Sequence, residues 1–329
     1  MRIDFIASST NIELGSYRIW VHDLCNTLND FDSDFHPINA YINSGHEDEA
    51  DVIICSKGDV LKVDKMKKKY PDKKIGVINP GSGHDCGADF VIVGSPEEYC
   101  SFSYMKHVFM YPLIEKMYMH RKPKEHYEKD LVIGFHGSYS HLPKFGFGLS
   151  GALEAFDKEE DFKLLVVTSS SDPNWKFGKP NIKDIEIVKW DFETVTSHLK
   201  RMDIGVVPNL TDLKGEVPMN LDSDLGLYNS DYMLRFKNKS NAGRSFVFMQ
   251  LGIPVIADLT PSNLHLLGGF DCGYLAMDKD GWLNALRELK NYQKRQDISE
   301  NAFRKFATEY DPWDWAKKLI DNIEEMWYD

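Results

Sequence analysis

Short apolar segments alternate with amphipathic or polar segments along almost the whole chain, and this alternation restricts the fold more than any other feature of the sequence. Each apolar segment is rich in β-branched or aromatic residues and is closed by Ser, Gly or Pro, which is typical of a buried strand. In the first part of the chain these segments are RIDFIAS (2–8), ADVIICS (50–56), KKIGVINP (73–80), ADFVIVGS (88–95) and HVFMYPL (107–113).

The same pattern restarts after a polar stretch without apolar periodicity, residues 116–130. The second set of predicted strands is LVIGFHGS (131–138), FKLLVVTSS (162–170), IEIVKWD (185–191), DIGVVPN (203–209), IPVIADL (253–259) and CGYLAMD (272–278). Strands that alternate with helices predict a parallel sheet covered on both faces, and two such runs predict two Rossmann-like domains. We therefore expect an N-terminal domain over 1–115, a linker over 116–130 and a C-terminal domain over 131–310.

This architecture also predicts where a ligand binds. Ligands of parallel α/β sheets bind beyond the carboxyl ends of the strands, so the cleft between the two domains is the expected site. The last segment, 311–329, is predicted to be a helix because large apolar residues recur in it at spacings of four. They are Trp315, Leu319, Ile323 and Trp327. Such a helix either covers one domain or crosses back to the other.

Charge and cysteine content exclude several classes of protein. The chain has 329 residues, with 51 acidic and 39 basic side chains, and this excess of negative charge disfavours nonspecific nucleic-acid binding. The five cysteines include no C-x-x-C pair, which favours reduced thiols over a disulfide framework or a zinc site. No signal peptide and no transmembrane segment is expected, so the predicted location is the cytoplasm.

A cluster of cations stands directly before the most apolar helix–strand unit, although the formal net charge is −12. The cluster consists of Arg235, Lys237, Lys239 and Arg244. Ser240 or Asn241 is a good N-cap for a helix that ends near Gly252. Unpaired N–H groups at a helix start, flanked by Lys and Arg, form an anion site, and we expect phosphate there. Solvated surface charge is the alternative for any single one of these side chains.

The segment 235–257 resembles the donor-binding segment of GT-B glycosyltransferases, in particular the GT4-like group of bacterial polysaccharide enzymes. It combines a K-S-N run, a helix and a G-I-P-V-I-A strand. Generic matches extend the resemblance over nearly the whole chain: DIGVVPN, LVIGFHGS, the terminal helix with its tryptophans, and LGSYRIWVHDLCNTLND (14–30). The resemblance implies an α/β fold of two Rossmann-like domains that face a central cleft.

The resemblance also implies a function. The chain would be a hexosyltransferase-like enzyme of polysaccharide biosynthesis that moves a sugar from a UDP- or GDP-sugar to an acceptor hydroxyl. The C-terminal domain would bind the donor, and the N-terminal domain would bind the acceptor, a glycan or a lipid-linked glycan. The nucleotide sugar is a co-substrate, and no cofactor or metal is expected, because cationic side chains and a helix start would stabilise the leaving diphosphate.

Position within the resemblance assigns the diphosphate contacts. The expected contacts are Lys239, Ser240, Asn241, Arg244, Gly137, Ser138 and Lys144. Lys239 would neutralise the diphosphate, while Arg244 would either reach a phosphate or pack outward. Lys144 matches the family position loosely, and an ordinary strand-to-helix turn is the alternative for that loop. The chain departs from the family at Val247, where many GT4 enzymes carry a glutamate that contacts the donor.

Two loops of the first domain carry further candidate residues. In NIELGSYRIWVHD, Gly15 is a close-approach glycine and Arg18 a cation on the acceptor side of the cleft; a purely structural glycine is the alternative. NPGSGHDCG (79–87) follows a strong strand and contains His84 and Asp85. An imidazole near its ordinary pKa suits a catalytic base at the cleft edge, and a plain surface turn is the alternative.

The segment 209–234 is long for a loop of a compact α/β domain, and loops of this length tend to be functional or mobile. Its acidic residues Glu216, Asp222 and Asp224 could contact sugar hydroxyls or the acceptor. Asp222 and Asp224 have D-x-D spacing but no evident strand end beside them, so a metal-dependent reaction is the weaker case. A polar surface excursion is the alternative.

Three other functions remain open. The missing helix glutamate makes a catalytically inactive GT-B-like binding protein an alternative. Another Rossmann-type enzyme, such as a two-domain nucleotide-sugar epimerase, is a second; the absence of G-x-G-x-x-G after the first strand argues against dehydrogenases. A DNA-modifying glycosyltransferase of phage type is a third, although the acidic composition disfavours a nucleic-acid acceptor. The segment VDKMKKKYPDKK (63–74) is a local basic patch that could bind one. A solvated helix face is the alternative interpretation of this segment.

Overall fold

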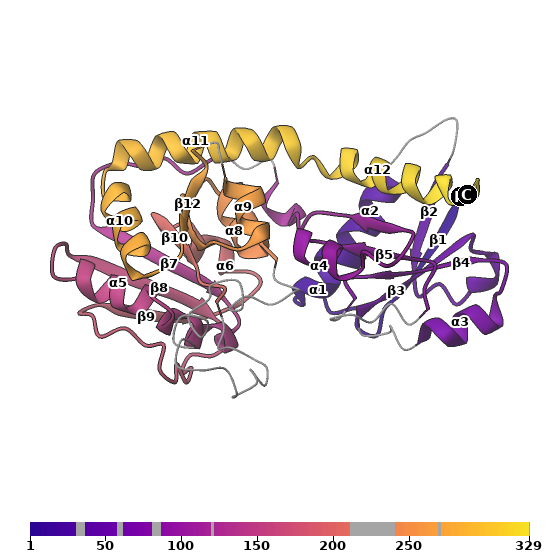
Figure 1. Ribbon diagram of the computed structural model, residues 1–329, viewed down its shortest axis with the longest axis horizontal. Coiled ribbons are helices and arrows are strands. Elements are labelled where there is room, and N and C mark those ends of the chain that lie inside the picture. The colour runs from indigo at the N-terminus through magenta and orange to yellow at the C-terminus, as the bar shows by residue number, and fades with distance from the viewer. Residues whose placement is uncertain are drawn as a thin grey trace, which may run out of the picture. The chain divides into compact units, whose positions relative to one another are not determined.

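The computed structural model describes residues 1–30, 37–57, 62–80, 87–119, 122–210, 241–268 and 271–328. The chain divides into two compact units, which we call unit 1 (Met1–Met119 and Ala307–Asp329) and unit 2 (His120–Phe306). Each unit holds one parallel sheet with helices (Figure 1). The boundary between 119 and 120 falls inside the segment 116–130, so that segment is shared between the units.

Within the described residues, unit 1 contains a six-stranded parallel sheet of order β2-β1-β3-β4-β5-β6. Its strands are β1 (Arg2–Ile6), β2 (Asn39–Ile42), β3 (Val52–Ser56), β4 (Lys74–Ile78), β5 (Phe90–Val93) and β6 (Val108–Met110). Every strand segment predicted for this part of the chain contains one of them. β2 was not predicted, because Asn39 and Tyr41 are exposed on this edge strand and leave no apolar run.

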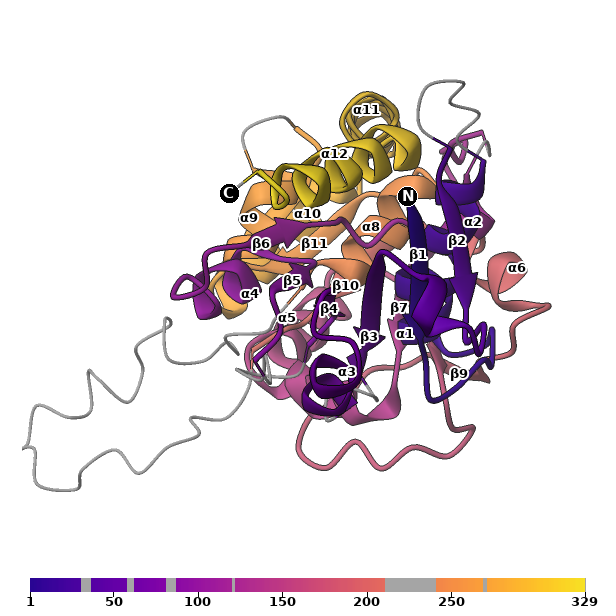
Figure 2. The ribbon, with the colours of Figure 1, turned by 90° about the vertical axis from the view of Figure 1, so that its right-hand side faces the viewer.

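The helices of unit 1 lie on both faces of its sheet. They are α1 (Gly15–Tyr17), the π-helical η1 (Arg18–Asp23), α2 (Leu24–Asn29), η2 (Glu47–Glu49), α3 (Val63–Lys69), α4 (Pro96–Ser101), η4 (Lys116–Tyr118) and α12 (Pro312–Glu325). α12 packs against α2 and β6, and Figure 2 shows α12 and α3 on opposite sides of the sheet. Val63 of α3 belongs to the apolar cluster that also contains Ile53 and Val77.

Unit 2 repeats the design, with a six-stranded parallel sheet of order β12-β11-β10-β7-β8-β9 in its described part. Its strands are β7 (Leu131–Gly137), β8 (Phe162–Thr168), β9 (Ile185–Lys189), β10 (Ile204–Val207), β11 (Val255–Asp258) and β12 (Gly273–Ala276). Each strand predicted from the sequence contains one of them. The α/β prediction of two Rossmann-like domains is therefore confirmed.

In the described part of unit 2 the helices are η5 (Tyr139–Gly146), α5 (Leu149–Phe156), α6 (Val195–Leu199), α8 (Gly243–Gln250), α9 (Pro261–Leu267), α10 (Lys279–Leu289) and the first part of α11 (Tyr292–Glu309). α5 and α10 bury Leu153 and Trp282 on one face of the sheet, together with Phe135 of β7. α8 covers the other face: Phe248 lies against Gly205 of β10. The sheet is thus enclosed on both sides.

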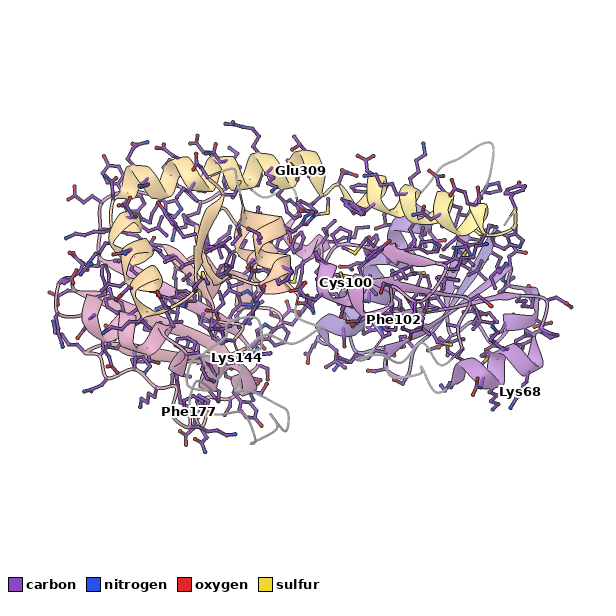
Figure 3. The ribbon with its side chains drawn as sticks, viewed as in Figure 1. Lys68, Cys100, Phe102, Lys144, Phe177 and Glu309 are labelled. Atoms are coloured by element: carbon purple, nitrogen blue, oxygen red, sulfur yellow. The ribbon has the colours of Figure 1, made fainter. Side chains whose placement is uncertain are left out.

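The terminal helix returns to the first unit. α11 begins in unit 2, its last residue is Glu309 (Figure 3), and α12 follows in unit 1. Asp311 caps α12 by accepting a hydrogen bond from the Trp313 N–H at 2.8 Å. The buried face of α12 contains Leu319 and Ile323, whereas Trp327 is exposed. No helix among the described residues has the length and apolar character needed to cross a membrane.

Candidate functional site

The carboxyl ends of three neighbouring strands of unit 2 bring polar residues together. β11, β10 and β7 are adjacent and parallel. β7 ends at Gly137, β11 ends at Asp258, and Asn209 follows β10. Arg244, in the first turn of α8, reaches the same edge. This is the edge at which sheets of this type bind ligands.

Arg244 is anchored at one of its two terminal nitrogens. Its Nη2 donates hydrogen bonds to the Pro208 carbonyl at 2.9 Å and to Asn209 Oδ1, and the guanidinium lies 5.4 Å from the centroid of the Phe135 ring. Its Nη1 is buried, with no hydrogen-bond partner among the described residues. A buried donor in this condition carries a desolvation penalty that an acceptor group beside it would remove.

Asn209 presents a second donor of the same kind. Its side chain is only 3% exposed. Because Oδ1 accepts from Arg244, the amide orientation is set, and Nδ2 has no hydrogen-bond partner within the described part of the chain. Arg244 and Asn209 are hydrogen-bonded to each other and each retains one buried donor. A cationic guanidinium N–H together with an amide N–H can donate to the oxygens of an anion such as phosphate.

The loop after β7 contacts this pair. Gly137 has a φ of 139°, and a Cβ there would lie 3.3 Å from Arg244 Cδ, so a larger residue would press on the arginine. Lys144 Nζ donates to the Asn209 carbonyl at 3.2 Å. The Ser138 hydroxyl accepts from the Ser140 N–H at 3.3 Å and starts η5. The structure therefore brings Gly137, Lys144 and Arg244 together, while Ser138 makes the turn beside them.

Asp258 lies beneath the same edge and is 1% exposed. Its Oδ2 accepts from the N–H groups of Asn209 at 2.6 Å and Leu210 at 2.9 Å, and its Oδ1 accepts from Trp282 Nε1 at 3.2 Å. Burial raises the pKa of Asp258 to about 6, although these hydrogen bonds and Lys144 oppose the shift. Sequence reasoning singled out neither Asp258 nor Asn209. The signal available for both was that they are the first polar side chains at the carboxyl ends of buried strands.

Among the described residues, the positive charge of this edge comes from two side chains. Burial lowers the pKa of Arg244 to about 10, so the guanidinium keeps its charge at neutral pH. Burial and the charge of Arg244 lower the pKa of His136 to about 4, so this imidazole is neutral. His136 Nε2 lies 3.4 Å from the Arg244 carbonyl, which can only accept, so Nε2 carries the proton. Arg244 and Lys144 therefore supply the positive charge.

The start of α8 differs from the prediction. The helix begins at Gly243 with Ala242 as its N-cap, so Asn241 is not the cap residue. Asn241 lies one residue before the N-cap, and its Oδ1 accepts a hydrogen bond from the Gly243 N–H at 3.3 Å. The side chain thus binds the second residue after it, which is the geometry of a turn leading into the helix. At the other end, Gly252 follows the helix with a φ of 68°, as predicted for a C-terminal glycine.

In unit 1, Arg18 is turned inward. Its side chain is buried, and its Nη2 and Nε lie 2.8 and 3.1 Å from Glu115 Oε2. Its Nη1 donates to the carbonyl of Ile12 at 2.8 Å. Gly15 lies next to it, since a Cβ there would be 3.8 Å from Arg18 Nη2. Within unit 1 the guanidinium is thus paired with Glu115, and the role of Arg18 on the acceptor side stays a prediction.

Several predicted site residues lie outside the described residues. They are His84, Asp85, Lys239, Ser240, Glu216, Asp222 and Asp224. Their roles as base, diphosphate contacts and loop contacts stay predictions. Within the described ranges, no group of three or more His, Cys, Asp or Glu side chains gathers as a metal site. Metal independence also stays a prediction, because the D-x-D pair is among the residues not described.

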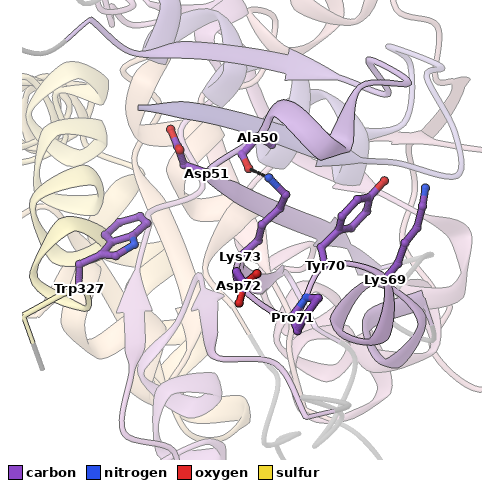
Figure 4. Close-up of a pocket in the computed structure, with 8 residues that line it drawn as sticks. All are labelled: Ala50, Asp51, Lys69, Tyr70, Pro71, Asp72, Lys73 and Trp327. Atoms are coloured by element: carbon purple, nitrogen blue, oxygen red, sulfur yellow. Dashed lines mark hydrogen bonds between the residues drawn. The ribbon is translucent and has the colours of Figure 1, made fainter.

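Other polar surfaces lie away from the carboxyl edges. Lys68 points outward from α3 (Figure 3), which fits the solvated helix face considered for the basic patch. A pocket of about 300 Å³ lies where β3 and β4 begin, at the amino edge of the unit 1 sheet. Lys73 crosses it to donate to the Ala50 carbonyl, and Trp327 forms one of its walls (Figure 4). The pocket thus belongs to unit 1, whereas the strand-end site described above belongs to unit 2.

Comparison with solved structures identifies the fold. The lipopolysaccharide outer core galactosyltransferase WaaB, in its apo form, matches with a TM-score of 0.57 and 13% identity over 99% of this chain and 100% of that chain. Sucrose-phosphate synthase from Thermosynechococcus elongatus matches with a TM-score of 0.61 and 13% identity, over 100% and 99%. Anabaena Alr3699/HepE in complex with UDP and glucose matches with a TM-score of 0.61 and 10% identity, over 99% and 100%.

These matches are to glycosyltransferases of the GT-B type, and identities this low establish the fold alone. No protein-family model and no curated protein sequence matches the chain. The two-domain GT-B fold expected from the resemblance is thus confirmed over the full length of the chain. Membership of the GT4-like group stays a prediction.

Proposed function

We propose that this protein transfers a glycosyl group from a nucleotide-diphosphate sugar to an acceptor hydroxyl, and that unit 2 binds the donor. The observation that carries the proposal is the pair of buried donors, Arg244 Nη1 and Asn209 Nδ2, without hydrogen-bond partners in the described part of the chain. They stand at the carboxyl edge of the second sheet, where a diphosphate would supply the acceptor oxygens.

The chemistry proposed for this edge is stabilisation of the leaving group. When the bond between the sugar and the diphosphate breaks, negative charge develops on the nucleotide diphosphate. Arg244 is already anchored to Pro208 and Asn209, so little reorganisation is needed when that charge appears. Lys144, whose Nζ lies 3.2 Å from the Asn209 carbonyl, adds a second positive charge. Close approach of the diphosphate is helped by Gly137, which has no side chain to intervene.

Further features of the proposal come from the sequence. Lys239 and the backbone of Ser240 and Asn241 would complete the diphosphate site, and His84 with Asp85 would remove the acceptor proton. We propose that these cations make a divalent metal unnecessary. UDP-sugars are the first donors to test, because the matched HepE structure contains UDP and glucose; GDP-sugars follow. The acceptor we propose is a glycan or a lipid-linked glycan.

The test measures donor binding and turnover separately. Isothermal calorimetry with UDP and GDP measures affinity, and release of the nucleoside diphosphate from UDP-glucose or UDP-galactose, with and without oligosaccharide acceptors, measures turnover. We expect micromolar to millimolar nucleotide binding and acceptor-dependent release. Absence of binding to every nucleoside diphosphate would overturn the proposal.

One observation favours a second candidate, a binding protein without turnover. Val247 of α8 is buried at the position where many GT4 enzymes carry a donor-contacting glutamate. Nucleotide binding with neither transfer nor hydrolysis of any sugar donor would support this alternative.

A further inference from the structure

We propose that Asp258 is a positioning residue for the donor site: its buried carboxylate holds the Pro208–Leu210 segment in the arrangement that aims Arg244 and Lys144 at the diphosphate. This inference rests on the proposed function. Asp258 is the last residue of β11, and Asn209 follows the neighbouring strand β10. The two residues are 49 positions apart in sequence and meet because the strands run parallel and end together.

The carboxylate organises the segment through its backbone. Asp258 Oδ2 accepts from the consecutive N–H groups of Asn209 at 2.6 Å and Leu210 at 2.9 Å. Two consecutive N–H groups on one oxygen restrict the backbone of this turn. Trp282 Nε1 donates to Oδ1 at 3.2 Å from the buried face of α10 and thereby fixes the rotation of the carboxylate. Asp258 is therefore tied to α10 on one side and to the strand-end segment on the other.

The same short segment carries the acceptors that hold both cations. The Pro208 carbonyl and Asn209 Oδ1 accept from Arg244 Nη2, and the Asn209 carbonyl accepts from Lys144 Nζ. A shift of this segment would move Arg244 and Lys144 together. It would also move Asn209 Nδ2, the second buried donor. Asp258 touches none of these ligand-facing atoms, so its effect on a ligand would pass through the segment.

Two effects of Asp258 on an anion oppose each other, and this makes the inference testable. As a negative charge near Arg244 and Lys144 it weakens the attraction of the site for phosphate. As the anchor of Pro208–Leu210 it strengthens binding by positioning the donors. Without its side chain, the N–H groups of Asn209 and Leu210 would lose their acceptor, and the segment would rearrange to satisfy them. We infer that positioning outweighs repulsion.

The experiment compares UDP affinity by calorimetry in the full-length wild type, Asp258→Ala and Asp258→Asn. We expect Asp258→Ala to weaken UDP binding about 10-fold, the lower end of the effect of a lost charged hydrogen bond. Asp258→Asn should lose less, because its one carbonyl oxygen can still accept from both backbone N–H groups. If Asp258→Ala does not fold, Asp258→Asn carries the test. Unchanged or tighter binding in the folded variants overturns the inference.

Asp203 provides a matched control at the opposite end of β10. It is also fully buried, and it accepts from the Val132 N–H at 3.0 Å and from Lys124 Nζ at 2.7 Å. Asp203→Asn should lower stability and leave UDP affinity of the folded protein unchanged. An equal loss of affinity in Asp203→Asn would reduce the role of Asp258 to general stability and overturn the inference.

A double-mutant cycle measures whether Asp258 and Arg244 affect UDP binding through each other. A purely structural role of Asp258 would give no such coupling. In an Arg244→Ala background, Asp258→Ala should weaken UDP binding further by less than about 3-fold, because residues that act through each other are not additive. Full additivity overturns the inference. Failure of the wild type to bind any nucleoside diphosphate is a different result: it overturns the proposed function, and this inference with it.

Discussion

Replacing Arg244 by Lys should weaken nucleoside-diphosphate binding while leaving a positive charge in place. In the wild type, Nη2 is occupied by the Pro208 carbonyl and Asn209 Oδ1, and Nη1 remains for a ligand. A lysine has one nitrogen on a flexible stem and cannot reproduce the planar fork that serves both sides. The expected cost is that of one charged hydrogen bond, about 1.5–3 kcal/mol, which corresponds to a rise of roughly 10–100-fold in Kd.

The measurement is calorimetric titration of UDP and GDP into both proteins at low and moderate salt. If the loss of affinity comes from a lost hydrogen bond, it should be the same at both salt concentrations. A loss caused by long-range electrostatics should be smaller at the higher salt concentration, because salt screens such interactions. Arg244 keeps its charge well above neutral pH, with a pKa of about 10, so its own titration does not contribute to any change of wild-type affinity between pH 6 and 8. Thermal unfolding of each protein shows how much of the change is structural.

Arg295 offers the control. It is 2% exposed in α11 of unit 2, and its Nη1 donates to the carbonyls of Leu289 at 2.7 Å and Lys290 at 2.8 Å, at the end of α10. Arg295→Lys therefore also replaces a buried fork, away from the strand-end edge. It should lower thermal stability without changing UDP affinity. Equal affinities in wild type and Arg244→Lys, or equal losses in the two variants, would refute the assignment of Arg244 to the diphosphate.

Four further outcomes are expected. Lys239→Ala should weaken UDP binding by about 1.5–3 kcal/mol in calorimetry; unchanged affinity would remove Lys239 from the site. His84→Ala should lower kcat by roughly 10²–10⁴-fold at unchanged nucleotide affinity, and normal turnover would make its loop a simple turn. EDTA should leave turnover unchanged; loss that Mg²⁺ or Mn²⁺ restores would point instead to Asp222 and Asp224. Because folding raises the pKa of Asp258 from 3.8 to about 6, the stability it contributes is present at pH 4 and is lost as pH rises through 6. Relative to Asp258→Asn, the wild type should therefore lose up to about 3 kcal/mol of unfolding free energy between pH 4 and 7, and a constant difference in urea unfolding would contradict this.

The strands could be predicted because burial of a strand produces a local apolar pattern in the sequence. A strand covered on both faces must be apolar at successive positions, as in FVIV of β5 or VIAD of β11, so a short apolar run suffices to locate it. β2 escaped prediction because it lies at a sheet edge and alternates exposed with buried residues over only four positions. The terminal helix was predicted from the spacing of its large apolar residues. That spacing does not indicate which unit buries Leu319 and Ile323.

The candidate site was predicted only where a single segment carries the signal. Arg244 was singled out because cations gather before an apolar helix, and Gly137 because of its position in the family resemblance. The predicted N-cap of α8 was wrong, because Ala242 has no polar side chain that would indicate a helix start. Asn241 forms the preceding turn instead. The ion pair of Arg18 could not be predicted, because Glu115 lies 97 positions away in the sequence.

By itself, the sequence determined most of the strands and the alternation of strands and helices that builds two Rossmann-like units. Only the tertiary structure decided which polar groups meet. Asp258, Asn209 and Arg244 lie on three separate segments, and strand order places them at one edge. The reason is physical: burial and helix capping depend on neighbours in the chain, whereas the hydrogen-bond partners of a strand end depend on which strands pair, a long-range choice that no local pattern encodes.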